Sequence, residues 1–163
     1  MSVTATVAST INCTETFTGD SIGSNNTVNH TGLDKTVALT SASTPPITLY
    51  AGGSVALSGG AKTLDLTALA EGTNGGVIDA TGLKCQVARF ENPSTNANTI
   101  TVKFGASNPY LLGGAGWTTV LSPGQYVMYY GNDATPDVAA GSADEIDFAG
   151  TAVQPFKYEM IFG

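Results

Sequence analysis

The sequence is short of charge, and above all of positive charge. Only 12% of its 163 residues are charged, about half the usual share, and six Lys and Arg face thirteen Asp and Glu, which gives a net charge of −7. The six cations are scattered along the chain and form no basic patch. Such a chain has no electrostatic means of gripping phosphate backbones or anionic lipid. We therefore expect no nucleic-acid partner and no membrane partner.

Long apolar runs are missing as well. No stretch approaches 18 consecutive apolar residues, so a transmembrane helix is not expected. Residues 1–17 contain neither the basic region nor the apolar region of a secretory signal peptide. We expect a protein that is made in the cytoplasm and is not exported by its own N-terminus.

Side chains suited to catalysis are scarce. The single histidine, His30, lies in a polar stretch without the apolar scaffold that would position a catalytic base. No nucleophile, phosphate-binding or zinc-binding motif is present. Cys13 and Cys85 belong to no CxxC pair, and we interpret them as free thiols, with a disulfide between them as the alternative. The sequence predicts no enzymatic activity and no cofactor.

Acidic residues gather in one place, between residues 131 and 148. This segment contains Asp133, Asp137, Asp144, Glu145 and Asp147. We interpret it as a solvated loop at the rim of the fold. Because Ca²⁺ takes clustered oxygen ligands, a calcium site stays open as an alternative, although the spacing does not match an EF-hand. Paired carboxylates for glycoside hydrolysis are conceivable, but no feature favours them.

What the chain has in abundance is Gly, Ser, Thr and Asn, set between short alternating apolar segments. The clearest is the segment 100–104, in which Ile100, Val102 and Phe104 alternate with Thr101 and Lys103. Similar segments occur at 83–90, 117–121, 125–130, 145–149 and 156–162. About eight to ten short strands at even spacing predict an all-β protein, an antiparallel β-sandwich or jelly roll. We place this sandwich at residues 36–163.

The first 35 residues are weakly patterned. We expect them to form an N-terminal arm or peripheral strands, with strands at 3–7 and 11–17 and a polar loop at 18–35. Gly52 and Gly53 lie between two short apolar segments and predict a hairpin turn.

Two apolar features suggest contact with another subunit. In the Gly-rich segment 106–117, the apolar side chains either fold back as a lid over the core or form an exposed patch; a sugar-binding platform is a third alternative. The strand at 126–130 is bulky on both faces, so that its second face is covered either by its own chain or by a neighbour. The candidate interface therefore consists of Tyr110, Leu111, Leu112, Trp117, Val127 and Tyr129.

The chain ends on an unusually apolar segment. Phe156, Tyr158, Met160 and Phe162 alternate with Lys157 and Glu159. Such a strand invites aggregation if it is left at a free edge. We expect it to lie inside a sheet, paired on both sides.

The segment "FENPSTNANTITVKFGASNPYLLGGAGWTTVLSPGQYVMYYG", followed by "AGSADEIDFAG" and "FKYEMIFG", resembles small structural proteins of tailed-phage virions. The resemblance covers about residues 83–163. It implies a β-sandwich virion component, a head decoration or cement protein that forms homo-oligomers, often trimers, and binds a capsid or tail surface. A carbohydrate-binding or receptor-binding β-sandwich module is the alternative function.

Overall fold

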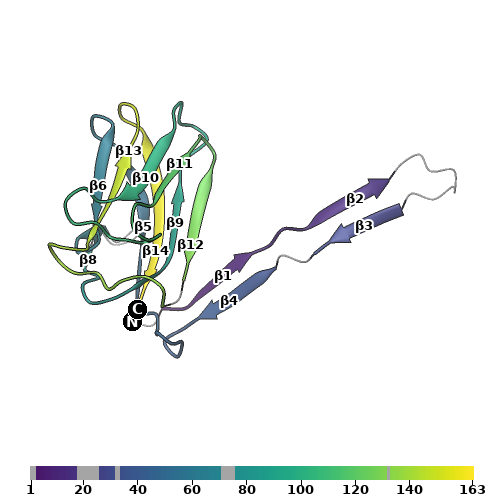
Figure 1. The fold of residues 1–163 in the computed structure, drawn as a ribbon, viewed down its shortest axis with the longest axis horizontal. Helices are drawn as coiled ribbons and strands as arrows, with labels where there is room; N and C mark the ends of the chain where they lie inside the picture. The colour runs from purple at the N-terminus through teal and green to yellow at the C-terminus, as the bar shows by residue number, and fades with distance from the viewer. Residues whose placement is uncertain (1–2, 18–25, 32–33, 71–75, 132) are drawn as a thin grey trace.

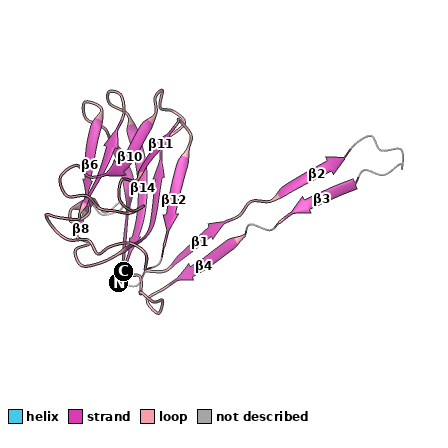
Figure 2. Cartoon of the chain, viewed as in Figure 1, coloured by secondary structure: helices cyan, strands magenta, loops and turns pink. Residues whose placement is uncertain are grey.

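The computed structural model describes residues 3–17, 26–31, 34–70, 76–131 and 133–163, which contain strands and no helix (Figures 1 and 2). No helix in this part of the chain is long and apolar enough to cross a membrane. The strands are β1 (Ala5–Ser9), β2 (Cys13–Phe17), β3 (Asn26–His30), β4 (Lys35–Leu39), β5 (Leu49–Ala56), β6 (Ala61–Asp65), β7 (Leu69–Ala70), β8 (Val77–Ile78), β9 (Cys85–Glu91), β10 (Ile100–Phe104), β11 (Thr118–Leu121), β12 (Tyr126–Tyr130), β13 (Glu145–Ala149) and β14 (Pro155–Phe162).

Two four-stranded antiparallel sheets form the body of the molecule. The strand order is β12-β9-β14-β5 in one sheet, called here the ribbon-side sheet, and β11-β10-β13-β6 in the other, the far sheet. Most strands of the sandwich that follow each other in sequence lie in different sheets, as with β5 and β6, β9 and β10, and β13 and β14, whereas β10 and β11 are neighbours in the far sheet. This wrapped order is that of a jelly roll. The predicted all-β sandwich is confirmed.

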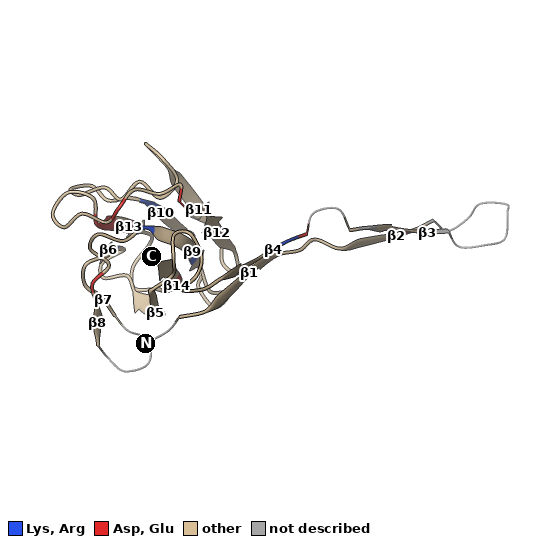
Figure 3. Ribbon diagram, turned by 90° about the horizontal axis from the view of Figure 1, so that it is seen from below, with Lys and Arg blue, Asp and Glu red and all other residues tan. Residues whose placement is uncertain are grey.

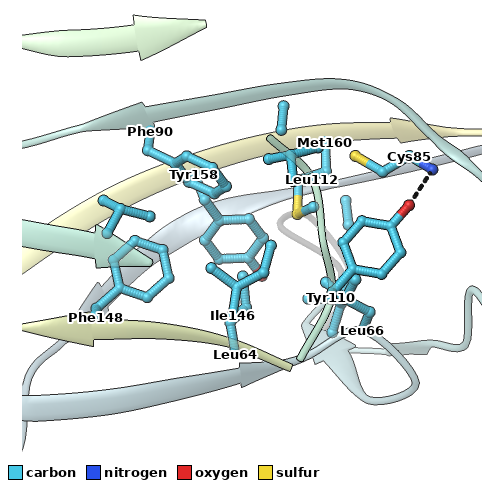
Figure 4. Close-up of a cluster of buried hydrophobic side chains, with 14 of the residues drawn as sticks. Leu64, Leu66, Cys85, Phe90, Tyr110, Leu112, Ile146, Phe148, Tyr158 and Met160 are labelled. Carbon is cyan, nitrogen blue, oxygen red and sulfur yellow. Dashed lines mark hydrogen bonds between the residues drawn. The ribbon is translucent and has the colours of Figure 1, made fainter. Parts of the chain in front are cut away.

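The core lies between the two sheets and is rich in aromatic side chains (Figure 4). The ring of Phe148 on the far sheet stacks on that of Phe156 on the ribbon-side sheet, with 3.8 Å between their centroids. Phe90 meets Phe148 edge-on at 5.4 Å. These contacts join the two sheets, and area burial of this kind dominates the stability of a β-sandwich.

The terminal strand β14 is paired on both sides, with β5 and with β9, as predicted. Its alternation matches its burial: Phe156, Tyr158, Met160 and Phe162 are each at most 1% exposed. Lys157 points to the outer face of the sheet, opposite Glu91 on β9.

The hairpin predicted at Gly52 and Gly53 is wrong. Strand β5 runs through both glycines without a turn, pairing Gly53 with Tyr158 and Gly52 with Glu159 on β14. The side chain of Tyr50 lies in the space that a Cβ at Gly52 would occupy. Gly52 therefore leaves room for the side chain of Tyr50 on its own strand, and the glycine pair does not reverse the chain.

The N-terminal strands form a long two-stranded ribbon that projects from one end of the body (Figures 1 and 3). β1 pairs with β4, and β2 pairs with β3 further along. Residues 26–30, expected in a loop, are thus strand β3, whereas residues 18–25 and 32–33 of that predicted loop lie outside the described part. β4, which the sequence pattern placed in the sandwich, belongs to the ribbon.

Candidate functional site: the ribbon and the outer face of the ribbon-side sheet

The base of the ribbon packs on the outer face of the ribbon-side sheet. In the β1–β4 pair, Val7 lies opposite Val37 and Ala5 opposite Leu39, so these side chains share one face. That face forms a second, small core together with the outer face of the sheet. Its buried members are Val7, Leu39, Ile47 and Val87, with Val3, Ala5, Val37, Met128, Tyr130 and Ile161 packed around them.

This packing explains why strand β12 is apolar on both sides. Val127 and Tyr129 point inward and pack against the main core. Met128 and Tyr130 point outward and are covered by the ribbon base. The ammonium group of Lys35, on β4, lies 5.1 Å from the centre of the Tyr130 ring. The part of the second face of β12 that Met128 and Tyr130 form is therefore covered by the protein's own N-terminal strands, whereas Tyr126 on the same face is exposed.

The Gly-rich segment 106–117 folds inward. Tyr110 is fully buried, and its hydroxyl accepts a hydrogen bond from the Cys85 amide at 2.9 Å and donates one to the Pro136 carbonyl at 2.8 Å (Figure 4). Burial raises the pKa of Tyr110, which keeps this hydroxyl protonated as a donor. The Trp117 ring packs edge-on against Tyr129 at 5.5 Å, and its Nε1 donates to the Tyr110 carbonyl.

This arrangement corrects the predicted interface. Tyr110, Leu112 and Trp117 are at most 8% exposed, Val127 and Tyr129 are partly buried against the core, and Leu111 is the most open of the six, at 37% exposure. The segment is the lid of the main core, which was one of the three alternatives. A sugar platform on Tyr110 and Trp117 is excluded because both rings are covered by the chain itself.

Beyond the ribbon base, the outer face of the ribbon-side sheet is open and carries a network of four charges. Arg89 bridges Glu91 and Glu159, the latter at 3.2 Å, and Lys157 contacts Glu91 at 3.1 Å. The guanidinium of Arg89 also lies 4.9 Å from the centre of the exposed Tyr126 ring. Two cations and two anions cancel, so that this face is neutral on an acidic protein.

Two adjoining hollows, each of about 300 Å³, lie on the same face. One lies between β1 and the sheet and is lined by Thr6, Val7 and Ala8 on the ribbon, with Met128 and other sheet residues as its floor. The second lies over Gly52 and Ser54 on β5. They share Tyr50, Arg89 and Glu159 on their adjoining sides, and the two hollows together are called here the groove beside the ribbon base.

The distal part of the ribbon, β2 and β3, lies well clear of the body (Figures 1 and 3). Its cross-strand contacts include a hydrogen bond of 2.9 Å from the Thr14 hydroxyl to Asn29 Oδ1. Two apolar side chains are open to solvent: Ile11, just before β2, at 62% and Val28 at 43%. Cys13 on β2 is an exposed free thiol, whereas Cys85 is free and buried.

The acidic residues between 131 and 148 form ion pairs and hydrogen bonds with the loops and the sheet around them. Asp133 lies 2.8 Å from the ammonium of Lys84. Asp147 accepts hydrogen bonds from the Thr63 hydroxyl at 2.7 Å and from the Ala106 amide at 3.0 Å. No three Asp, Glu, His or Cys side chains of the described residues gather as metal ligands. His30, the histidine considered above, ends strand β3 in the ribbon.

The sequence prediction missed the open sheet face and the groove. A signal for the face was present, because Arg89 and Glu91, and likewise Lys157 and Glu159, are spaced by two within strand patterns and so share a face. The groove has no such signal, since it arises from the way the ribbon lies on the sheet. No family model, curated protein or solved structure matches this chain.

Proposed function

We propose that this protein is a non-enzymatic structural component of a virion, a decoration or cement protein that oligomerises and binds a viral shell. The observation that carries the proposal is the ribbon. A two-stranded ribbon standing alone in water is marginally stable, yet β2 and β3 extend from the body with Ile11 and Val28 exposed. A ribbon of this kind is stabilised when it lies against another protein surface.

The body has the stability that a decoration protein needs. It is a jelly roll with a continuous aromatic core and its own lid, so it stays folded without a partner. The resemblance of residues 83–163 to structural proteins of tailed-phage virions points to a phage capsid or tail surface as the location. A homotrimer is the favoured assembly, and the partners are copies of this chain and the shell.

The proposal is tested on particles of the virus that encodes the chain. Mass spectrometry of purified virions should find the protein at a fixed ratio to the shell protein. Purified protein should also rebind particles that lack it, whereas a variant with residues 10–34 replaced by Asn-Gly should not. A protein that is absent from virions and does not bind them contradicts the proposal.

A carbohydrate-binding or receptor-binding module is the second candidate. Tyr126 and Tyr50 are 63% and 46% exposed on the open face and flank the charged pair Arg89–Glu159. Exposed tyrosines beside charged hydrogen-bonding groups can stack on sugar rings and orient their hydroxyls. A glycan array tests this: binding that is lost in Tyr50→Ala and kept in Val153→Ala supports the module, and no binding to any glycan removes it.

A further inference from the structure

The edge of strand β1 is open and faces the groove. β1 has one neighbour in the described part of the chain, β4, so its other edge has no strand beside it. Thr6, Val7 and Ala8 along this strand line the hollow above the ribbon-side sheet. An open strand edge is a template for another strand. A floor of side chains beneath it completes a site for β-strand addition, in which main-chain bonds hold the added segment and the floor selects it.

The floor of the groove is chemically mixed and electrically neutral. Met128 and Ile161 provide apolar surface close to β1, and Arg89 and Glu159 are paired with each other further out. A segment that fits this floor has apolar side chains and few charges. A strongly basic or strongly acidic segment would have to break the Arg89–Glu159 pair.

The distal ribbon of another copy has this composition. Among its described residues, 10–17 and 26–31, Glu15 is the only charged residue, and Ile11 and Val28 are exposed apolar groups. Residues 10–34 carry three of the thirteen acids, and most of the others lie on the far sheet and in the loops of the body, as with Asp65, Asp147 and Asp133. Two chains that each carry a net charge of −7 repel least when the ribbon of one meets the neutral face of the other.

The dimensions of the ribbon agree with this occupant. At about 3.3 Å per residue, the strand from Ser9 to Phe17 reaches roughly 25–30 Å beyond the base. A body of this size has a radius of gyration of about 14 Å, so the ribbon can reach across a neighbouring body. The chain between β1 and β4, residues 10–34, is 25 residues long, within the roughly 20–30 that one side of a stable interface uses.

We infer that the groove between β1 and the outer face of the ribbon-side sheet receives the distal ribbon of a second copy of this chain. The incoming ribbon extends alongside the open edge of β1, and Ile11 and Val28 anchor it. The inference rests on the proposed function, because it names the partner of the same ribbon. Each copy gives one ribbon and receives one, which closes either a reciprocal dimer or a ring.

Disulfide trapping tests the contact directly, because Cys13 is an exposed thiol on the ribbon. A second cysteine is placed in the groove of the full chain, by Thr6→Cys on β1 or by Ser54→Cys on β5. Within one chain, Thr6 and Cys13 are about 23 Å apart along the ribbon, too far to be bridged. We expect chains to be linked as disulfide dimers under mild oxidation, and the links to vanish when Cys13→Ser is added. The matched control is Val120→Cys, on the far sheet at a site 59% exposed, which should link no more than the wild type.

Light scattering on point variants provides the second readout. Ile11→Asp and Val28→Asp should convert the oligomer to monomer while the far-ultraviolet circular dichroism spectrum stays that of the wild type, because neither side chain packs against the body. Val153→Asp, at an apolar site 72% exposed in a loop, should leave the mass unchanged.

Three results overturn the inference: a monomeric wild type, linking at Val120→Cys equal to that at the groove positions, or a mass that Ile11→Asp and Val28→Asp leave unchanged. A monomer that is nevertheless found on virions overturns this inference and leaves only the shell-binding part of the proposed function standing. An oligomer with ribbon-to-groove links that is absent from virions supports this inference and contradicts the proposed function.

Discussion

At the scale of single residues, Phe156 and Lys157 are neighbours that face opposite sides of β14. Phe156 is 1% exposed and stacks on Phe148, so Phe156→Ala should lower the free energy of unfolding by about 3–5 kcal/mol. Lys157 makes a partly exposed ion pair with Glu91, and Lys157→Ala should cost less than about 1 kcal/mol. Thermal melts of the two variants check this. Small and equal shifts in Tm for the two variants would contradict the placement of Phe156 in the core and of Lys157 on the outer face.

The carboxylate of Glu91 should contribute to the pH dependence of the protein's stability. The ammonium of Lys157 donates a hydrogen bond to it and, with Arg89, lowers the pKa of Glu91 below its ordinary value of 4.5. A lowered folded pKa means that the contribution to stability is present above that ordinary value and is lost as pH falls through the folded pKa. In Glu91→Gln the drop in Tm between about pH 5 and pH 3 should be smaller than in the wild type. Equal drops would contradict this role.

Residue patterns predicted the regular strands and failed where the packing is not periodic. Ile100 and Val102 are buried, as their alternation indicates, because one face of β10 meets the core. Tyr110 and Trp117 looked exposed because they lie among glycines. Gly114 and Gly116 adopt φ values of +89° and +74°, which let the chain turn back and bury those rings. No local spacing encodes such a return.

At the scale of elements, the ribbon has two parts with different roles. The base, β1 and β4, covers Val87, Met128 and Ile161 and belongs to the fold. The distal part, β2 and β3, buries no face against the body and shows weak alternation for the same reason. The sequence left β3 in a loop because its residues are mostly polar and rich in Asn.

This division predicts how far the ribbon can be shortened. Because Ser9 lies opposite Lys35, a two-residue Asn-Gly turn in place of residues 10–34 fits the register of the hairpin. The Tm of this short-ribbon variant should stay within a few degrees of the wild-type value, since no core contact is removed. Deletion of residues 1–40 should lower Tm more and expose apolar surface that binds a hydrophobic dye. Equal Tm values for the two variants would contradict separate roles for the base and the distal part of the ribbon.

At the scale of the whole molecule, the protein combines a self-sufficient jelly roll, a projecting ribbon and a neutral face on an otherwise acidic surface. The fold class could be predicted from the even spacing of short strands and turns. The ribbon and the groove could not, because they depend on where β1 and β4 lie in space relative to β9, β12 and β14. We propose that the ribbon and the groove both serve assembly.

The measurement that tests this account most directly is the mass in solution of the full chain and of the short-ribbon variant, by light scattering at equal concentration. We predict a full-length assembly of at least two 16.5 kDa chains and a short-ribbon monomer with an unchanged far-ultraviolet circular dichroism spectrum. Two monomers, or two oligomers containing the same number of chains, would contradict the claim that the ribbon is the assembly element.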